Sequence, residues 1–80
     1  MKVSAQISIY PLRQEKLTPA INAVREALET RGLTPDVGPM STAVTGDSAA
    51  VFLGLQQAFE AASVKGDTVV TITVSNACPT

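Results

Sequence analysis

The residues of this sequence that could do chemistry are neutral hydrogen-bonding side chains, placed at every second position of two short segments. They are Ser4, Gln6, Ser8 and Tyr10 in residues 3–10, and Thr71, Thr73 and Ser75 in residues 68–75. Hydroxyl and amide groups donate and accept hydrogen bonds, so a row of them can recognise the polar edge of a small molecule. A surface meant only for water usually carries Lys or Glu. We therefore expect a ligand or a second subunit to cover this row, the alternative being that Ser and Thr only favour strands.

Groups that would support catalysis are scarce. The sequence has no histidine, which is the commonest general base and metal ligand. Cys78 is the only cysteine, so it forms no disulfide within the chain and has no evident base or metal partner. Gly32, Gly38 and Gly46 are isolated and form no phosphate-binding loop. The sequence predicts a binding protein without enzymatic activity, metal or cofactor.

Charge and composition exclude further classes of protein. The net charge is −1, the 6 basic residues are scattered, and aromatic residues make up 4% of the chain, which argues against nucleic-acid binding. No apolar run approaches the roughly 20 residues that span a bilayer. Residues 1–10 show no signal-peptide pattern, so we expect a cytoplasmic protein. A length of 80 residues predicts one domain over residues 1–80.

A strand and a helix are predicted first along the chain. Residues 3–10 alternate strictly between apolar and polar types, which predicts a strand with one buried face, and Pro11 should end it. A helical apolar spacing follows over residues 19–31, with Thr18 as the expected N-cap and Gly32 as the left-handed residue after its end.

The rest of the chain is predicted to form a hairpin, a second helix and a last strand. Residues 34–46 are expected to form two short strands with Pro39 near the turn, and alternation leaves open whether Thr42 or Ala43 faces the core. Asp47 is the expected N-cap of a second helix, and Thr68–Ser75 the last strand. The apolar stripe of that helix consists of Val51, Phe52, Leu55, Ala58, Phe59 and Ala62.

The element order β-α-β-β-α-β predicts an α+β fold of the ferredoxin-like type. In this fold a four-stranded antiparallel sheet is covered by two helices on one face, and the other face stays open. We expect the first and last strands to lie at the centre of the sheet, so that their neutral polar side chains share the open face.

Three segments of the sequence resemble the family of small thiamine-binding proteins. They are Val3–Leu12, Gly38–Thr42 and the pair Gly46-Asp47, and the similarity extends in order and spacing over nearly the whole chain. The resemblance implies a ferredoxin-like fold, binding of thiamine or its hydroxymethylpyrimidine part without catalysis, and association into dimers or tetramers.

Carried over by position, the resemblance also names candidate ligand-binding residues. They are Gln6, Ser8, Tyr10, Thr42 and Asp47. Each has a structural alternative: Asp47 as a helix cap, Thr42 as a cross-strand partner, and Tyr10 as part of a subunit contact. The family often has an acidic residue just before the glycine that is Gly46 here, whereas this chain has Thr45.

Two other functions fit the same features. One is a regulatory domain like the ACT domains, which senses a different small metabolite such as an amino acid. The other is a structural oligomer whose polar sheet face is entirely a contact between subunits.

Overall fold

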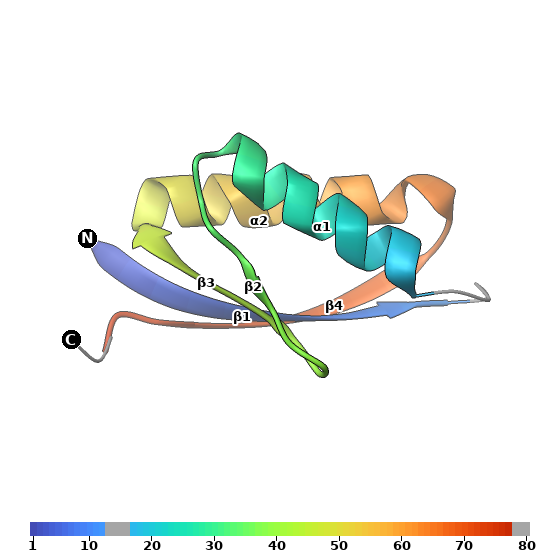
Figure 1. Ribbon diagram of the computed structural model, residues 1–80, viewed down its shortest axis with the longest axis horizontal. Coiled ribbons are helices and arrows are strands. Elements are labelled where there is room, and N and C mark those ends of the chain that lie inside the picture. The colour runs from blue at the N-terminus through green and yellow to red at the C-terminus, as the bar shows by residue number, and fades with distance from the viewer. Residues whose placement is uncertain (13–16, 78–80) are drawn as a thin grey trace.

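The computed structural model describes residues 1–12 and 17–77, and its elements follow the predicted order (Figure 1). They are β1 (Lys2–Pro11), α1 (Thr18–Thr30), β2 (Asp36–Val37), β3 (Thr42–Asp47), α2 (Ser48–Ala62), the short 3₁₀ helix η1 (Ser63–Lys65) and β4 (Thr68–Ser75). The ferredoxin-like α+β fold is thereby confirmed, and β1 includes Pro11 as its last residue, as expected. Cys78 lies outside the described residues.

The four strands form one antiparallel sheet in the order β2-β3-β1-β4. The prediction that the first and last strands share the centre was wrong for β4, which is an edge strand, and β3 takes the central place beside β1. The reason is topological. Each strand-helix-strand connection returns to the sheet two places away, and the first strand of the other half lies between the two strands that it joins.

The core lies between the sheet and the two helices, which cover the same face of the sheet (Figure 1). Odd-numbered residues of β1 point into it, and the largest fully buried side chains are Leu28, Val24 and Val51. The whole core consists of Val3, Ala5, Ile7, Ala20, Val24, Leu28, Leu33, Val44, Val51, Leu55, Ala58 and Ala62. The alternation in residues 3–10 therefore corresponds to one buried and one open face of β1.

The start of α1 differs from the prediction by one residue. The helix begins at Thr18, its N-cap is Leu17, and no side chain caps it, so the assignment of Thr18 as N-cap was wrong. Because Leu17 already has helical dihedral angles, the capping position falls on a residue that has no side-chain acceptor. The backbone carbonyl of Leu17 instead accepts a hydrogen bond from the N–H of Ala20 at 3.1 Å.

The end of α1, at Thr30, falls one residue before the predicted end at residue 31, and Gly32 has the predicted left-handed conformation. Gly32 has φ = +78°, in the left-handed region that glycine adopts without strain. The N–H of Leu33 donates to the carbonyl of Leu28 at 3.2 Å, and that of Gly32 to Glu29 at 3.0 Å. This pattern satisfies the last carbonyls of the helix and folds the Leu33 side chain onto the core.

Asp47 is the N-cap of α2, as predicted. Its backbone is extended and its Oδ2 accepts a hydrogen bond from the N–H of Ala49 at 3.2 Å. Of the predicted apolar stripe, Phe52 and Phe59 are only partly covered and remain 55% and 44% exposed. Both therefore lie at the margin of the core.

The hairpin has a shorter first strand than residues 34–46 suggest. β2 contains only Asp36–Val37, and Pro39 lies in the connection to β3, as expected. Thr42 pairs with Ile7 and is 3% exposed, whereas Ala43 lies on the open side opposite Gln6. The structure thus decides which residue of the hairpin faces the core.

Candidate functional site

The open face of the sheet, on the side away from the helices, gathers the neutral polar residues of three strands. Pairing places Gln6 of β1 between Ala43 of β3 and Thr73 of β4, and Ser4 between Thr45 and Ser75. The expectation that the alternating polar residues of β1 and β4 share one face is correct. Its central residues are Ser4, Gln6, Ser8, Ala43, Thr45, Thr71, Thr73 and Ser75.

A shallow hollow of about 350 Å³ lies at the centre of this open face. Its size falls in the lower part of the range of about 300–1,000 Å³ that is usual for small-molecule sites. The sheet supplies only its floor, so a ligand there would be covered from one side. It is lined by Ser4, Ala5, Gln6, Ala43, Val44, Thr45, Thr73 and Ser75.

The hollow offers hydrogen bonds without charge. The hydroxyl oxygens of Ser4 and Thr45 lie 3.0 Å apart and bond to each other. Within residues 1–12 and 17–77, the side chains of Gln6 and Thr73 form no hydrogen bond to the protein. Their amide and hydroxyl groups are therefore available to a ligand, and they can both donate and accept.

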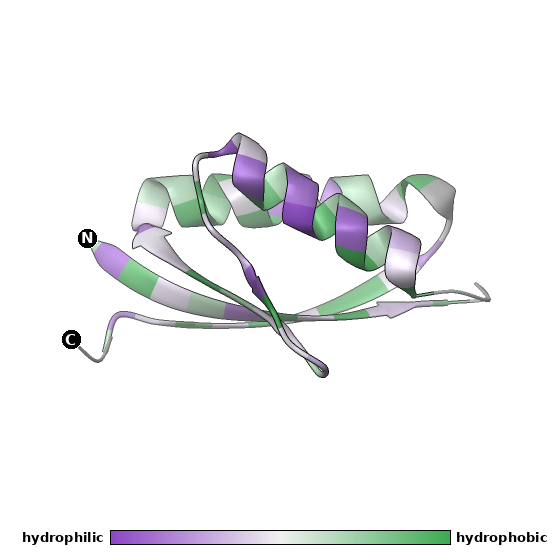
Figure 2. Cartoon of the chain, in the orientation of Figure 1, coloured by the Kyte–Doolittle hydropathy of each residue, from purple (hydrophilic) through white to green (hydrophobic). Residues whose placement is uncertain are grey.

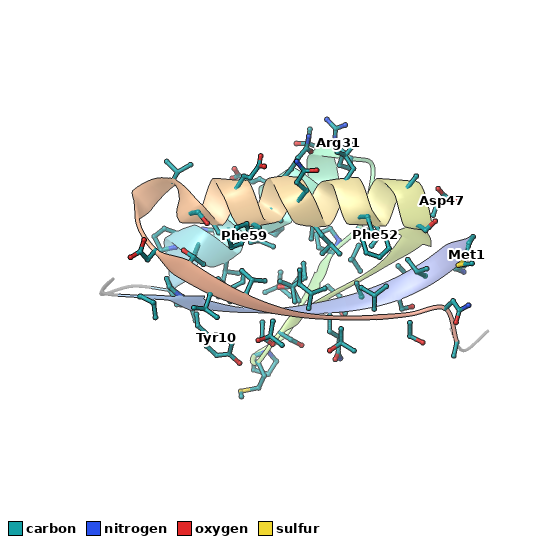
Figure 3. All side chains as sticks on the ribbon, turned by 180° about the vertical axis from the view of Figure 1, so that it is seen from behind. Met1, Tyr10, Arg31, Asp47, Phe52 and Phe59 are labelled. Carbon is teal, nitrogen blue, oxygen red and sulfur yellow. The ribbon has the colours of Figure 1, made fainter. Side chains whose placement is uncertain are left out.

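Three of the five predicted ligand-binding residues lie along one face of β1. Gln6 lines the hollow. Ser8 is the next residue of β1 on the same face, and its hydroxyl donates a hydrogen bond to the carbonyl of Met40 at 3.4 Å. Tyr10 follows toward the end of the strand, 54% exposed and pointing away from the helices (Figure 3). This group is continuous, with Gln6 in the hollow and Tyr10 two residues beyond Ser8.

Thr42 and Asp47 lie elsewhere. Thr42 is buried on the helix side of the sheet and is one of the residues that line a small cavity of about 40 Å³. Asp47 caps α2, and its Oδ1 lies 3.3 Å from the amino group of Met1. Figure 3 places Asp47 and Tyr10 at opposite ends of the sheet. The structure does not bring the five residues together, and a ligand-binding role for each stays a prediction.

Residues of the hairpin complete the hollow, and the sequence prediction missed them. Ala43 and Thr45 could not be assigned to the open face while the phase of residues 42–47 was undecided. The extended pairing of β3 with β1 fixes that phase. The sequence carries no clear signal for this choice, because Thr42, Val44 and Gly46 on the core side are as mixed in polarity as Ala43 and Thr45 on the open side.

Other kinds of site have little support in the part of the chain that the structure describes. No three residues among His, Cys, Asp and Glu come together there as a metal site would require. No helix in residues 1–12 and 17–77 is long and apolar enough to cross a bilayer.

Comparisons with known proteins bear on the family and the fold. A family model described as thiamine-binding protein matches residues 5–76. Among solved structures, a Streptococcus pneumoniae protein has 25% sequence identity and a TM-score of 0.84, with 94% of this chain and 86% of that one covered. A hypothetical protein of Methanocaldococcus jannascii has 20% identity and a TM-score of 0.86, with 99% and 84% covered.

A further solved structure has a name related to thiamine. It is a Thermotoga maritima protein provisionally assigned to thiamine biosynthesis or salvage, with 20% identity, a TM-score of 0.78, and 92% of this chain and 82% of that one covered. The comparison with curated proteins finds no match. Since the family model spans nearly the whole fold from β1 to the end of β4, the chain belongs to the thiamine-binding protein family.

Proposed function

We propose that this chain binds the hydroxymethylpyrimidine part of thiamine, free or within thiamine, and does not transform it. The observation on which this rests is the neutral hydrogen-bonding hollow at the centre of the open face, in a chain of the thiamine-binding family. We further propose that the protein works in the cytoplasm as a homo-oligomer, either a dimer or a tetramer.

The chemistry of the hollow suits an aminopyrimidine. Such a ring is flat and presents hydrogen-bond donors and acceptors along its edge, which amide and hydroxyl side chains such as those of Gln6 and Thr73 can match. The flat sheet floor offers Ala43 as a small apolar neighbour for the ring. Binding of an aminopyrimidine ring in the hollow therefore needs no charged side chain.

The neutral lining also bears on which part of thiamine is recognised. Thr45 lines the hollow at the position where the family often has an acidic residue. Without that carboxylate, the cationic thiazolium ring has no partner of opposite charge in the hollow. We therefore expect the isolated pyrimidine to bind at least as tightly as thiamine.

The shape of the hollow supports an oligomer. Its floor is the sheet and its other side is open, whereas small-molecule sites usually bury 70–90% of a ligand. A second subunit laid against the open face would cover the ligand and give partners to hydroxyl groups around the hollow. Absence of catalysis is proposed because the lining offers no group that is titratable near neutral pH.

Isothermal titration with hydroxymethylpyrimidine and with thiamine tests this function. A matched pair of variants on one face of β4 localises the site: Thr73→Val removes a hydroxyl that lines the hollow, whereas Thr71→Val removes one outside it. Loss of one hydrogen bond predicts roughly 2- to 10-fold weaker binding for Thr73→Val and an unchanged Kd for Thr71→Val.

Two results would contradict the proposal in different ways. No heat with either compound at millimolar concentration would remove thiamine and its pyrimidine as ligands. Equal weakening by both valine variants, or by neither, would place the ligand outside the hollow. If a panel of metabolites then shifted the melting temperature, a sensor of another metabolite would be the better description.

A further inference from the structure

The hollow on the open face presents side chains, and not backbone groups, to a ligand. The middle of its floor is β1, which pairs with β3 on one side and with β4 on the other. The N–H and C=O groups of paired strands lie in the plane of the sheet and bond to the neighbouring strands. They therefore do not point toward a molecule that rests on the sheet face, and recognition in the hollow depends on side chains.

Every polar side chain that lines the hollow can both donate and accept a hydrogen bond. These side chains are Ser4, Gln6, Thr45, Thr73 and Ser75. A hydroxyl changes its role by rotation of its hydrogen, and an amide by a half-turn that exchanges its oxygen and nitrogen. A carboxylate only accepts and a lysine or arginine only donates, and the lining contains none of these. The residue types therefore do not fix the direction of the hydrogen bonds.

In the described part of the chain, little holds these groups in one orientation. Gln6, Thr45 and Thr73 are exposed, and the side chains of Gln6 and Thr73 form no hydrogen bond to residues 1–12 and 17–77. Thr45 bonds to Ser4 at 3.0 Å, and either hydroxyl can be the donor. Binding sites with sharp selectivity usually lock such side chains by packing and by further hydrogen bonds. The groups in this hollow can instead turn to suit a ligand.

The strands around the hollow also differ in polarity from the charged surface of the molecule. Figure 2 shows the most hydrophilic residues along α1, whereas β4, which supplies Thr73 and Ser75, is pale or green. A neutral surface of hydroxyl groups offers no compensation for the cost of removing a charged ligand from water. The hollow therefore suits a neutral ligand.

We propose that the hollow accepts neutral pyrimidines of both donor–acceptor patterns, so that an oxopyrimidine binds about as well as an aminopyrimidine. This inference rests on the proposed binding of hydroxymethylpyrimidine in the hollow, and it widens the class of ligand. In hydroxymethylpyrimidine an amino donor lies beside a ring nitrogen that accepts. In the analogue with a carbonyl oxygen in place of the amino group, an acceptor lies beside a ring N–H that donates. The hollow thus selects the positions of the hydrogen-bonding groups and not their direction.

Thr45 is the residue on which this breadth depends. A carboxylate at its position, which is frequent in the family that the sequence resembles, could only accept, and it would favour an amino group over a carbonyl oxygen. A site built for one pattern rejects the reversed pattern strongly, because polar groups are left without partners. A threonine hydroxyl removes the fixed acceptor and with it this basis for rejection.

Isothermal titration with hydroxymethylpyrimidine and with its oxo analogue tests the inference. The wild-type protein should bind the two compounds with Kd values within about 5-fold of each other. Thr45→Asp introduces a group that only accepts, so it should favour hydroxymethylpyrimidine by more than about 10-fold. Thr45→Asn has the same shape but both donates and accepts, so its two Kd values should stay within about 5-fold.

Thr71→Asp is the control for added charge. Thr71 lies on the same face of β4 but outside the hollow, so this variant should keep the wild-type ratio of the two Kd values. An equal change of the ratio in Thr71→Asp and Thr45→Asp would overturn the role of Thr45. If Thr45→Asp does not fold, the wild-type protein and Thr45→Asn still decide the matter.

The results also separate this inference from the proposed function. A wild-type protein that binds hydroxymethylpyrimidine but binds the oxo analogue more than about 10-fold more weakly would refute the inference and leave the proposed function intact. A wild-type protein that binds neither compound would refute both.

Discussion

At the scale of single residues, the hollow depends on side chains that carry no charge. Gln6 and Thr73 face each other across β1 and β4, and neither side chain bonds within the described part of the chain. A neutral lining selects for hydrogen-bond geometry, whereas an acidic one would attract any cation. This difference at Thr45, one residue before Gly46, is the basis of the proposed preference for the pyrimidine over intact thiamine.

Gly46 leaves room for the side chain of Leu33. A Cβ atom at this position would lie 2.8 Å from Cδ2 of Leu33 and 3.6 Å from Cγ2 of Val51, and both of those residues are buried. Such an overlap forces neighbouring side chains out of their positions. The glycine thus lets Leu33, which follows the end of α1, pack onto β3.

Gly46→Ala is therefore expected to lower the free energy of unfolding by about 1–3 kcal/mol. Urea denaturation followed by circular dichroism measures this loss. Leu33→Val shortens the clashing side chain, so Gly46→Ala should cost less in that background, and the double-mutant cycle should give a positive coupling. Equal costs in both backgrounds would show that Leu33 is not the cause.

At the scale of elements, the two helices begin in different ways. α2 begins at a side-chain cap supplied by Asp47, whereas α1 begins after Leu17 with backbone hydrogen bonds alone. A cap of the first kind stabilises a protein by about 0.5–2 kcal/mol. The two helix starts therefore provide a matched comparison.

Asp47→Ala is expected to lower the melting temperature, because the N–H of Ala49 loses its acceptor, at a cost of about 1 kcal/mol. Asp47→Asn should keep most of the stability, because asparagine caps helices about as well as aspartate. Thr18→Ala should change stability by less than about 0.5 kcal/mol, because Thr18 is not the cap. A loss for Thr18→Ala as large as that for Asp47→Ala would contradict the assignment of the caps.

At the scale of the whole molecule, the two faces of the sheet differ in what covers them. The helices and the core cover one face, whereas the open face contains the hollow. The proposed contact with a second copy therefore involves the open face, and a charged side chain placed there tests it.

Ser8→Lys tests the open face. Ser8 lies on that face, paired with Thr71 of β4. A lysine in its place should disrupt a face-to-face contact, because the contact would bury an unpaired charge. Light scattering should then show a lower mass, whereas Asn22→Lys on the exposed side of α1 should leave the mass unchanged. An unaltered mass for Ser8→Lys would mean that the open face is in contact with water.

Much of the fold follows from local patterns in the sequence. Strict alternation in residues 3–10 predicts β1 and its buried face, Gly32 marks the end of α1, and Asp47 marks the start of α2. Each of these signals is local, since it depends on the spacing of side chains or on backbone preferences within a few residues. For that reason they could be interpreted without knowing which strands become neighbours.

The sequence by itself thus determined the elements, their order and the neutral character of one sheet face. Only the tertiary structure decided that β4 lies at an edge, that Thr42 faces the core and that Thr45 joins Gln6 in the hollow. These facts depend on the pairing of β1 with β3 and with β4, segments that lie far apart along the chain. Strand pairing and register come from the packing of the whole sheet against both helices, and a periodicity within one segment does not contain that information.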